Sequence, residues 1–402
     1  MLISFKPLFK YRDFRLLFLG QLISWFGNML TYVALPYQIY HLTHSSLAVG
    51  NVGIVQLIPL LVTSLWGGAL ADKIDRRKLL ICAEFGMAVA TGLFFINSLL
   101  PHPHIWLIYV LAALASGLSG FHRPTLEAMT QVLVEHKDMP AAAALSTLKF
   151  SVVMIAGPAI AGFLLAKYDL SIVYLLDFFT YVISLVAIFC IKTRFTLEKN
   201  EEPIFRSIKE GIRYAMSRQE LIGTYAIDFV AMIFGMPMAL FPAIAEKFHS
   251  VVAIGWLYAG PSIGALLASI FSGWVDKFPR HGAAVAIAAL IWGIGIIGFG
   301  FSGSIFFAIF FLVIAGAADG VSGLFRMTMW NQTIPKNYRG RLAGIEMISY
   351  MSGPLLGNAE AGIVAAGFGT TFSVISGGAM CVIAVVVVTM MLPRFWKYSA
   401  VQ

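Results

Sequence analysis

The chain has 402 residues, of which 59% are hydrophobic and only 12% are charged, and its formal net charge is +8. A soluble protein has about 25% charged residues, so this chain has too few of them to cover a surface that faces water. The composition therefore excludes a soluble protein and predicts one that crosses a membrane many times. The excess of positive charge is explained below by membrane topology, so we expect no nucleic-acid partner.

Apolar stretches of about 20 residues, the length that a helix needs to cross a bilayer, recur along the whole chain. We therefore predict an all-α integral membrane protein with twelve transmembrane helices. The predicted spans are 16–40, 47–71, 79–99, 105–134, 141–166, 171–192, 220–247, 252–275, 282–301, 304–333, 342–366 and 369–392. Most connections between these spans are a few residues long, so neighbouring helices are expected to run antiparallel.

One connection is longer than the others and divides the chain. Residues 193–219 are charged and partly amphipathic, and six predicted spans lie on each side of them. We therefore predict an N-terminal six-helix bundle over 1–192, a cytoplasmic linker over 193–219 and a C-terminal six-helix bundle over 220–402.

The distribution of basic residues predicts which side of the membrane the termini occupy. Twelve spans place both termini on one side, and nearly all of the 28 Lys and Arg residues fall on that side or in the linker. Only Lys167 and Lys247 fall on the opposite side, and Lys149 lies within the fifth span. Because loops rich in Lys and Arg stay in the cytoplasm, we expect both termini to be cytoplasmic.

A short motif occurs twice, once in each half. "ASGLSGFHRPT" at 115–125 lies in the fourth span, and "ADGVSGLFRMT" at 318–328 lies in the tenth, which is the fourth span of the second half. The two halves are therefore interpreted as parallel copies. Each copy carries an arginine, Arg123 or Arg326, within an otherwise apolar run.

The segment after the second span resembles a known signature. "GALADKIDRRK" at 68–78 is similar to the loop between spans 2 and 3 of the major facilitator superfamily, although Asp75 replaces a glycine of that pattern. The resemblance implies two six-helix bundles that alternate between inward- and outward-open states. It also implies that the acid of the motif docks near the start of span 11 and gates the cytoplasmic side. The gating residues expected on this basis are Asp72, Arg76, Arg77 and Arg341, with a salt bridge within the loop as the alternative role of Asp72.

Three further stretches narrow the resemblance. "FHRPTLEAMTQVLV", "NQTIPKNYRGRLAG" and the C-terminal stretch that begins "GPLLGNAEAG" resemble the enterobactin-exporter-type branch of drug:proton antiporters. The resemblance implies a bacterial inner-membrane protein that exports an organic small molecule, with a siderophore as the first expectation. A broad multidrug or macrolide efflux pump and a siderophore or nutrient importer are the alternatives. Glu360 belongs to the "GNAEAG" marker and is expected to act as a gate or to serve in helix packing.

Ionisable residues within the predicted spans are candidates for function because burying them in a membrane is costly. Seven acids accompany three bases there, so at least four acids must be protonated, hydrated or bound to a ligand, which fits carboxylates that bind and release protons. The acids are Glu84, Glu127, Asp177, Asp228, Asp319, Glu346 and Glu360, and the bases are Arg123, Lys149 and Arg326.

Three of these acids are predicted to couple transport to protons. In the resembling superfamily, the first, fourth, seventh and tenth helices line the cavity, which favours Asp228 in span 7 and Asp319 in span 10. Glu346 in span 11 is a weaker candidate. Asp177 and Glu84 are interpreted as structural because their helices usually face lipid or the scaffold.

Four polar residues are candidates for binding the substrate, namely Asn28, Tyr32, Arg123 and Arg326. Asn28 and Tyr32 lie one turn apart midway along span 1, and hydrogen bonding between helices is the alternative role for both. Arg123 lies one turn from Glu127, and Arg326 lies two turns from Asp319. A structural ion pair is therefore the alternative for each arginine.

The sequence predicts a transporter that is not an enzyme and that needs no cofactor. It contains no phosphate-binding loop of the form GxxxxGK[ST], so a proton gradient rather than ATP is the expected energy source. His41, His44, His102 and His104 lie in outer loops, and we expect them to be solvated and to bind no metal. The expected partners are a siderophore or drug-like molecule, protons and membrane lipid, and the protein is expected to be a monomer.

Overall fold

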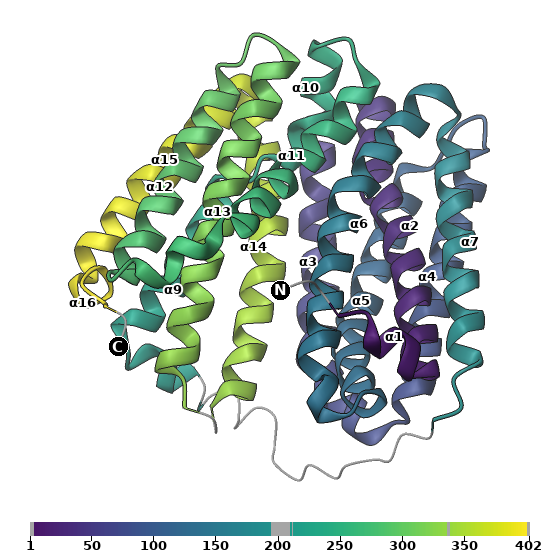
Figure 1. The fold of residues 1–402 in the computed structure, drawn as a ribbon. Coiled ribbons are helices and arrows are strands. Elements are labelled where there is room, and N and C mark those ends of the chain that lie inside the picture. The colour runs from purple at the N-terminus through teal and green to yellow at the C-terminus, as the bar shows by residue number, and fades with distance from the viewer. Residues whose placement is uncertain (1–3, 194–209, 211, 336–337, 400–402) are drawn as a thin grey trace. The chain divides into compact units, whose positions relative to one another are not determined.

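A computed structural model describes residues 4–193, 210, 212–335 and 338–399 (Figure 1). The side chains of 65–73, 274, 276–277, 339–341 and 343–349 lie outside this description. The described residues form helices and no strands, which confirms the predicted all-α class.

The helices of the first half follow the predicted spans closely. In chain order they are α1 (Lys6–Lys10), α2 (Arg12–Thr43), α3 (Ser46–Lys73), α4 (Arg76–Ser98), α5 (Ile105–Leu133), η1 (His136–Asp138), α6 (Met139–Lys167) and α7 (Leu170–Phe189). Pro36, Pro59, Pro124 and Pro158 lie inside α2, α3, α5 and α6. Prolines are tolerated inside membrane helices because neighbouring helices satisfy the backbone groups that they free.

The second half contains long helices joined by short ones. They are α9 (Gln219–Phe234), η2 (Met238–Leu240), α10 (Phe241–Lys247), α11 (Val251–Ile270), η3 (Ser272–Lys277), α12 (His281–Gly300), α13 (Ile305–Thr333), α14 (Arg339–Phe368), α15 (Thr370–Met391) and α16 (Pro393–Trp396). Within the described part of the chain, 11 helical segments are long and apolar enough to cross a membrane. They correspond to the predicted spans apart from the eleventh, which is covered by α14.

The seventh predicted span, 220–247, corresponds to the membrane-length segment Gln219–Lys247, but the helix within it is interrupted. α9 ends at Phe234, and the chain continues as a helix only from Met238. Pro237 has no backbone N–H, and the residue before a proline is disfavoured in a helix.

Neighbouring helices satisfy backbone groups freed by this break. The Tyr258 hydroxyl on α11 donates to the Met238 carbonyl at 3.1 Å, and the Asn358 side-chain oxygen on α14 accepts from the Ala239 N–H at 2.9 Å. The interruption of the helix is thus stabilised by hydrogen bonds from α11 and α14.

Contacts between residues divide the chain into two units. Unit 1 comprises Met1–Leu42 and Val55–Glu201, and unit 2 comprises Thr43–Ile54 and Glu202–Gln402. Residues 194–209 and 211 of the predicted linker lie outside the described residues. The domain boundaries at 192 and 220 therefore stay a prediction.

Small residues bring the helices of unit 2 close together. A Cβ atom at Gly316 on α13 would lie 1.9 Å from the Pro261 carbonyl oxygen on α11, and one at Gly264 would lie 2.0 Å from the Val313 carbonyl oxygen. Only glycine permits such approaches, which are typical of helix interfaces in membranes. This packing holds α13, the helix that carries Asp319 and Arg326, firmly against α11.

Candidate functional site

The strongest candidate site in unit 2 is a cluster of two acids and one arginine. Arg326 on α13 forms an ion pair through Nη1 with the Oδ1 atom of Asp228 on α9. Its Nη2 atom lies 3.5 Å from the Oδ1 atom of Asp319, two turns earlier on α13. The sequence therefore predicted the Arg326–Asp319 pair correctly, whereas the partner on α9 was not expected.

Two of the three charged side chains of this cluster are largely buried, which costs free energy unless the charges are paired. The side chains of Arg326 and Asp228 are 12% and 11% exposed, and that of Asp319 is 38% exposed. The Arg326 Nε atom is buried without a hydrogen-bond partner among the described residues. With both acids ionised the cluster carries one negative charge, and with one acid protonated it is neutral.

Aromatic side chains next to the cluster fix α9 against α13. The Trp330 Nε1 atom on α13 donates to Thr224 Oγ1 on α9 at 3.0 Å. The rings of Trp330 and Tyr225 stack with their centroids 5.5 Å apart. Asp228 and Arg326 are each one turn along the same two helices, so these contacts hold the acid and the arginine in register.

Unit 1 contains a second buried polar cluster, which the sequence did not reveal. Gln21 on α2, Glu84 on α4 and Ser184 on α7 are completely buried, and His122 on α5 is 8% exposed. Glu84 Oε1 lies 3.1 Å from His122 Nε2 and accepts a hydrogen bond from Gln21 Nε2, and Gln21 also donates to Ser184 at 3.3 Å. Glu84 Oε2 has no hydrogen-bond partner among the described residues.

The first copy of the repeated arginine has a different environment from the second. The Arg123 Nε atom lies 3.5 Å from Glu127 Oε1, as the spacing of one turn predicts. Their side chains are 43% and 67% exposed. Such an exposed pair contributes little to stability, so the two copies of the motif are not equivalent.

The polar residues of the first span lie between helices. The Asn28 amide donates to the Tyr181 hydroxyl on α7 at 3.1 Å, which agrees with the alternative of interhelical bonding. Tyr32 is 39% exposed. Asp177 on α7 is completely buried and accepts hydrogen bonds from Thr31 and Thr180, which fits its interpretation as a structural residue.

The predicted gating residues are only partly described. Arg77 donates through Nη2 to the Phe189 carbonyl at 2.7 Å and so caps the end of α7, while Arg76 is the half-buried first residue of α4. Glu360 on α14 is half-buried. The side chains of Asp72, Arg341 and Glu346 lie outside the described residues. The gating roles therefore stay predictions, as does the coupling role of Glu346.

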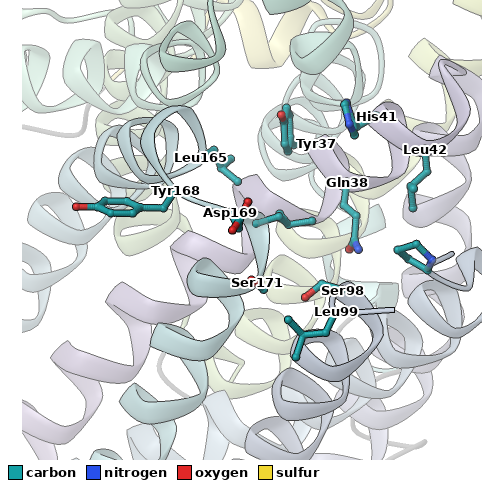
Figure 2. A pocket seen from close by; sticks show the side chains of 12 residues that line it. Tyr37, Gln38, His41, Leu42, Ser98, Leu99, Leu165, Tyr168, Asp169 and Ser171 are labelled. Carbon is teal, nitrogen blue, oxygen red and sulfur yellow. The ribbon is translucent and has the colours of Figure 1, made fainter. Parts of the chain in front are cut away.

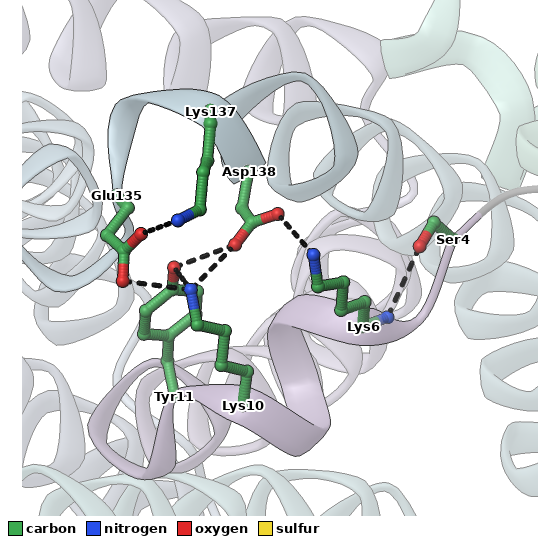
Figure 3. Close-up of polar contacts among 7 residues, drawn as sticks. All are labelled: Ser4, Lys6, Lys10, Tyr11, Glu135, Lys137 and Asp138. Atoms are coloured by element: carbon green, nitrogen blue, oxygen red, sulfur yellow. Dashed lines mark hydrogen bonds and ion pairs between the residues drawn. The ribbon is translucent and has the colours of Figure 1, made fainter.

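A surface network ties the N-terminal helix to the connection between α5 and α6 (Figure 3). Lys10 lies 2.8 Å from Glu135 and 3.1 Å from Asp138, which also accepts from the Tyr11 hydroxyl at 2.8 Å. Lys6 lies 3.3 Å from Asp138, and Lys137 lies 2.6 Å from Glu135. The hydrogen bond from Lys10 lowers the pKa of Glu135 from 4.5 to about 2, and the same bond raises the pKa of Lys10 above 10.5.

These pKa shifts predict that the stability of the folded protein depends on pH in the acid range. Because the folded pKa of Glu135 lies below its unfolded value, its stabilising contribution is present above pH 4.5 and is lost as the pH falls toward 2. Lys10→Met removes the main cause of the shift. We expect this variant to lose less thermal stability between pH 7 and pH 3 than the unaltered protein, as measured by intrinsic fluorescence. Lys78→Met, at an exposed position outside the network, serves as control, and an equal loss in all three proteins would contradict the prediction.

A cavity of about 560 Å³ opens in unit 1 between the end of α2, the end of α4 and the start of α7 (Figure 2). Gln38 in its wall is buried and accepts a hydrogen bond from the Tyr174 hydroxyl at 2.7 Å. The rings of Tyr37 and His41 stack with centroids 5.8 Å apart. None of the residues predicted from the sequence to act in transport lines this cavity.

The described part of the chain shows no group of metal ligands. Within it, no three His, Cys, Asp or Glu side chains lie together in an arrangement that could hold a metal ion.

Comparisons with known proteins give the class of the protein and then its family. The fold is similar to those of a POT family transporter in complex with 5-aminolevulinic acid (TM-score 0.76, 13% identity, 96% and 97% of the two chains covered) and of a mutant of the nucleoside transporter NupG (TM-score 0.76, 11% identity, 94% and 98% covered). The chain thus shares the fold of these transporters, and its membrane-length helices make it a multi-pass membrane protein. A family model described as transmembrane secretion effector matches residues 3–400, and the chain belongs to this family.

Curated relatives agree with this assignment. Enterobactin exporters EntS of Shigella boydii serotype 18 and of Escherichia coli O1:K1 are each 26% identical over 362 residues, which covers 90% of this chain and 87% of theirs. The family and these relatives together identify the chain as a transporter, and the predicted resemblance to enterobactin exporters is confirmed.

Proposed function

We propose that the protein exports an organic small molecule of the siderophore class, in exchange for protons, by alternating access. The observation that carries the coupling is Arg326 bridging Asp228 and Asp319 within unit 2. A cluster that shifts between one negative charge and neutrality on binding one proton has the chemistry that a proton-coupled transporter needs. The relatives named enterobactin exporter support the direction of transport and the class of substrate.

The membrane arrangement belongs to the same proposal. Both termini lie in the cytoplasm and the protein resides as a monomer in the bacterial inner membrane. The concentration of Lys and Arg on the N-terminal side of the spans supports this orientation. Protons then reach the acids from the outer side and leave toward the cytoplasm.

The coupling role is tested in proteoliposomes with an imposed pH gradient. Asp228→Asn and Asp319→Asn are expected to reduce proton-driven transport to the level of empty liposomes while preserving expression and folding, because neither amide can take up and release a proton. Glu127→Gln is the matched control, since its acid forms an exposed pair with the first copy of the arginine, and it should transport normally. Normal transport by both aspartate variants would refute the coupling role.

The substrate is tested by comparing the growth medium of a deletion strain with that of its parent when iron is scarce. Siderophore export predicts that one iron-chelating compound is depleted from the medium and retained in the cells. Unchanged siderophore levels together with sensitivity to drugs or macrolides would instead establish a drug efflux pump.

A further inference from the structure

Lys149 on α6 is a buried cation in unit 1 with an unusual environment. Its side chain has the burial of a core residue, with the whole residue only 8% exposed. Its Nζ atom lies 5.3 Å from the centroid of the Phe18 ring and 5.1 Å from that of Trp25, both on α2. None of the ion pairs among the side chains that the structure describes includes Lys149. An acid from a neighbouring helix, such as Glu346, is the alternative partner of Lys149, and the side chain of Glu346 lies outside the described residues.

The two rings sit on one face of α2, two turns apart, so the ammonium lies nearly midway between them. Trp25 is half-buried, and its ring makes an edge contact with Phe150, the residue next to Lys149, with centroids 5.7 Å apart. Phe150 is 38% exposed. An aromatic surface therefore leads from the buried ammonium to the outside of unit 1.

Ring faces alone do not compensate a buried ammonium. Contacts with aromatic faces offset only part of the cost of removing a charge from water. Lys167 on the same helix makes the comparison clear, because its Nζ atom lies over Phe163 and Tyr168 at 5.7 and 5.6 Å. Lys167 is exposed, so water solvates its charge, whereas Lys149 is only 8% exposed.

The buried acids of unit 1 do not supply the missing charge. Glu84 is bonded to Gln21 and His122, and Asp177 is bonded to Thr31 and Thr180. Because these two acids have other partners, an external anion is a source of the missing negative charge.

We propose that Lys149, Trp25 and Phe150 form a binding site for an aromatic anion, that is, a ring bearing a carboxylate or an ionised phenol. The anionic group forms an ion pair with the ammonium of Lys149, and the ring packs against Trp25 and Phe150. This inference rests on the proposed function, since it names the chemical class of the exported molecule. It adds residues from α2 and α6 to the expected substrate contacts Asn28, Tyr32, Arg123 and Arg326.

The test measures binding to the full-length protein in detergent micelles, without a pH gradient, by isothermal titration calorimetry. The probes are 2,3-dihydroxybenzoate, benzoate and benzamide, the last being an uncharged analogue of benzoate. The unaltered protein should bind 2,3-dihydroxybenzoate, and it should bind benzoate in preference to benzamide. Lys149→Met should weaken binding of 2,3-dihydroxybenzoate by about tenfold or more, the order expected for loss of one charge-assisted hydrogen bond.

Matched variants separate charge from structure. Lys149→Arg keeps the charge and should bind within about threefold of the unaltered protein, well under the tenfold loss expected for the methionine variant. Lys167→Met removes the exposed lysine of the same helix and should bind normally. If Lys149→Met does not fold, Trp25→Leu replaces it, and weakened binding of the ring is expected.

Several outcomes would overturn the inference. Equal affinity of Lys149→Met and the unaltered protein, or no preference for benzoate over benzamide, excludes the site. A double-mutant cycle can also exclude the site. If Glu346→Gln and Lys149→Met lower the free energy of unfolding equally, and the double variant lowers it no further, Lys149 has an internal ion-pair partner. If the unaltered protein binds the probes but shows no proton-driven transport, only the proposed coupling is refuted. If the unaltered protein shows proton-driven transport but does not bind the probes, only this site is refuted.

Discussion

Replacing Arg326 with methionine is expected to abolish transport and to lower the free energy of unfolding by about 3–5 kcal/mol, the usual cost of breaking a buried ion pair from one side. The variant leaves Asp228, which is 8% exposed, without its cation. It also removes the link between α9 and α13 that the ion pair provides. Thermal unfolding in detergent and transport in proteoliposomes measure the two effects.

Two further variants show whether the unpaired charge causes the loss of stability. Arg326→Met combined with Asp228→Asn removes both charges of the buried ion pair, and it should recover much of the lost stability but none of the transport. Arg123→Met removes the arginine of the first repeat, whose pair is exposed, and should change the unfolding free energy by roughly 0–1 kcal/mol. Comparable destabilisation by Arg123→Met and Arg326→Met would contradict the distinction between the two copies.

The repeated motif shows how far the sequence leads toward the site. It placed an arginine in the fourth helix of each half, and helical spacing correctly paired Arg123 with Glu127 and Arg326 with Asp319. It could not show that only Arg326 is deeply buried. That difference depends on Asp228, which lies 98 positions earlier on another helix, and such distant pairings leave no local pattern.

The same limit explains why the cluster around Glu84 was missed. Glu84 was interpreted as a structural residue from the place of its helix in the order of spans. No pattern in the first repeat assigns a role to His122. Gln21, Glu84, His122 and Ser184 come from four different helices. Their proximity follows from packing, which hydrophobic periodicity along one helix does not report.

Helix positions were predicted more reliably than helix continuity. Long apolar stretches set the spans because their backbone polar groups must be satisfied within each helix. The break after Phe234 escaped this argument because residues 235–237 are themselves uncharged. Pro237 was the available signal, and Tyr258 and Asn358, which stabilise the break, come from remote positions.

The cluster around Glu84 predicts a second large effect on stability. Glu84→Ala is expected to lower the free energy of unfolding by about 3 kcal/mol, because it removes the partner of both Gln21 and His122 and leaves a cavity in a closely packed region. His122→Ala should cost about 1–3 kcal/mol, since it removes one hydrogen bond to a completely buried carboxyl group. Unfolding in mixed micelles with increasing sodium dodecyl sulfate measures each change.

The double variant decides whether the two side chains act as one unit. Residues in one hydrogen-bonded network couple by about 0.5–3 kcal/mol, so Glu84→Ala with His122→Ala should be less destabilised than the two single changes added together. Glu84→Ala with Arg123→Met provides the control, because Arg123 follows His122 in the chain but pairs with the exposed Glu127, and those effects should add. Additive effects of Glu84 and His122 would mean that the 3.1 Å contact between them contributes nothing, and that Glu84 is held in unit 1 by Gln21 alone.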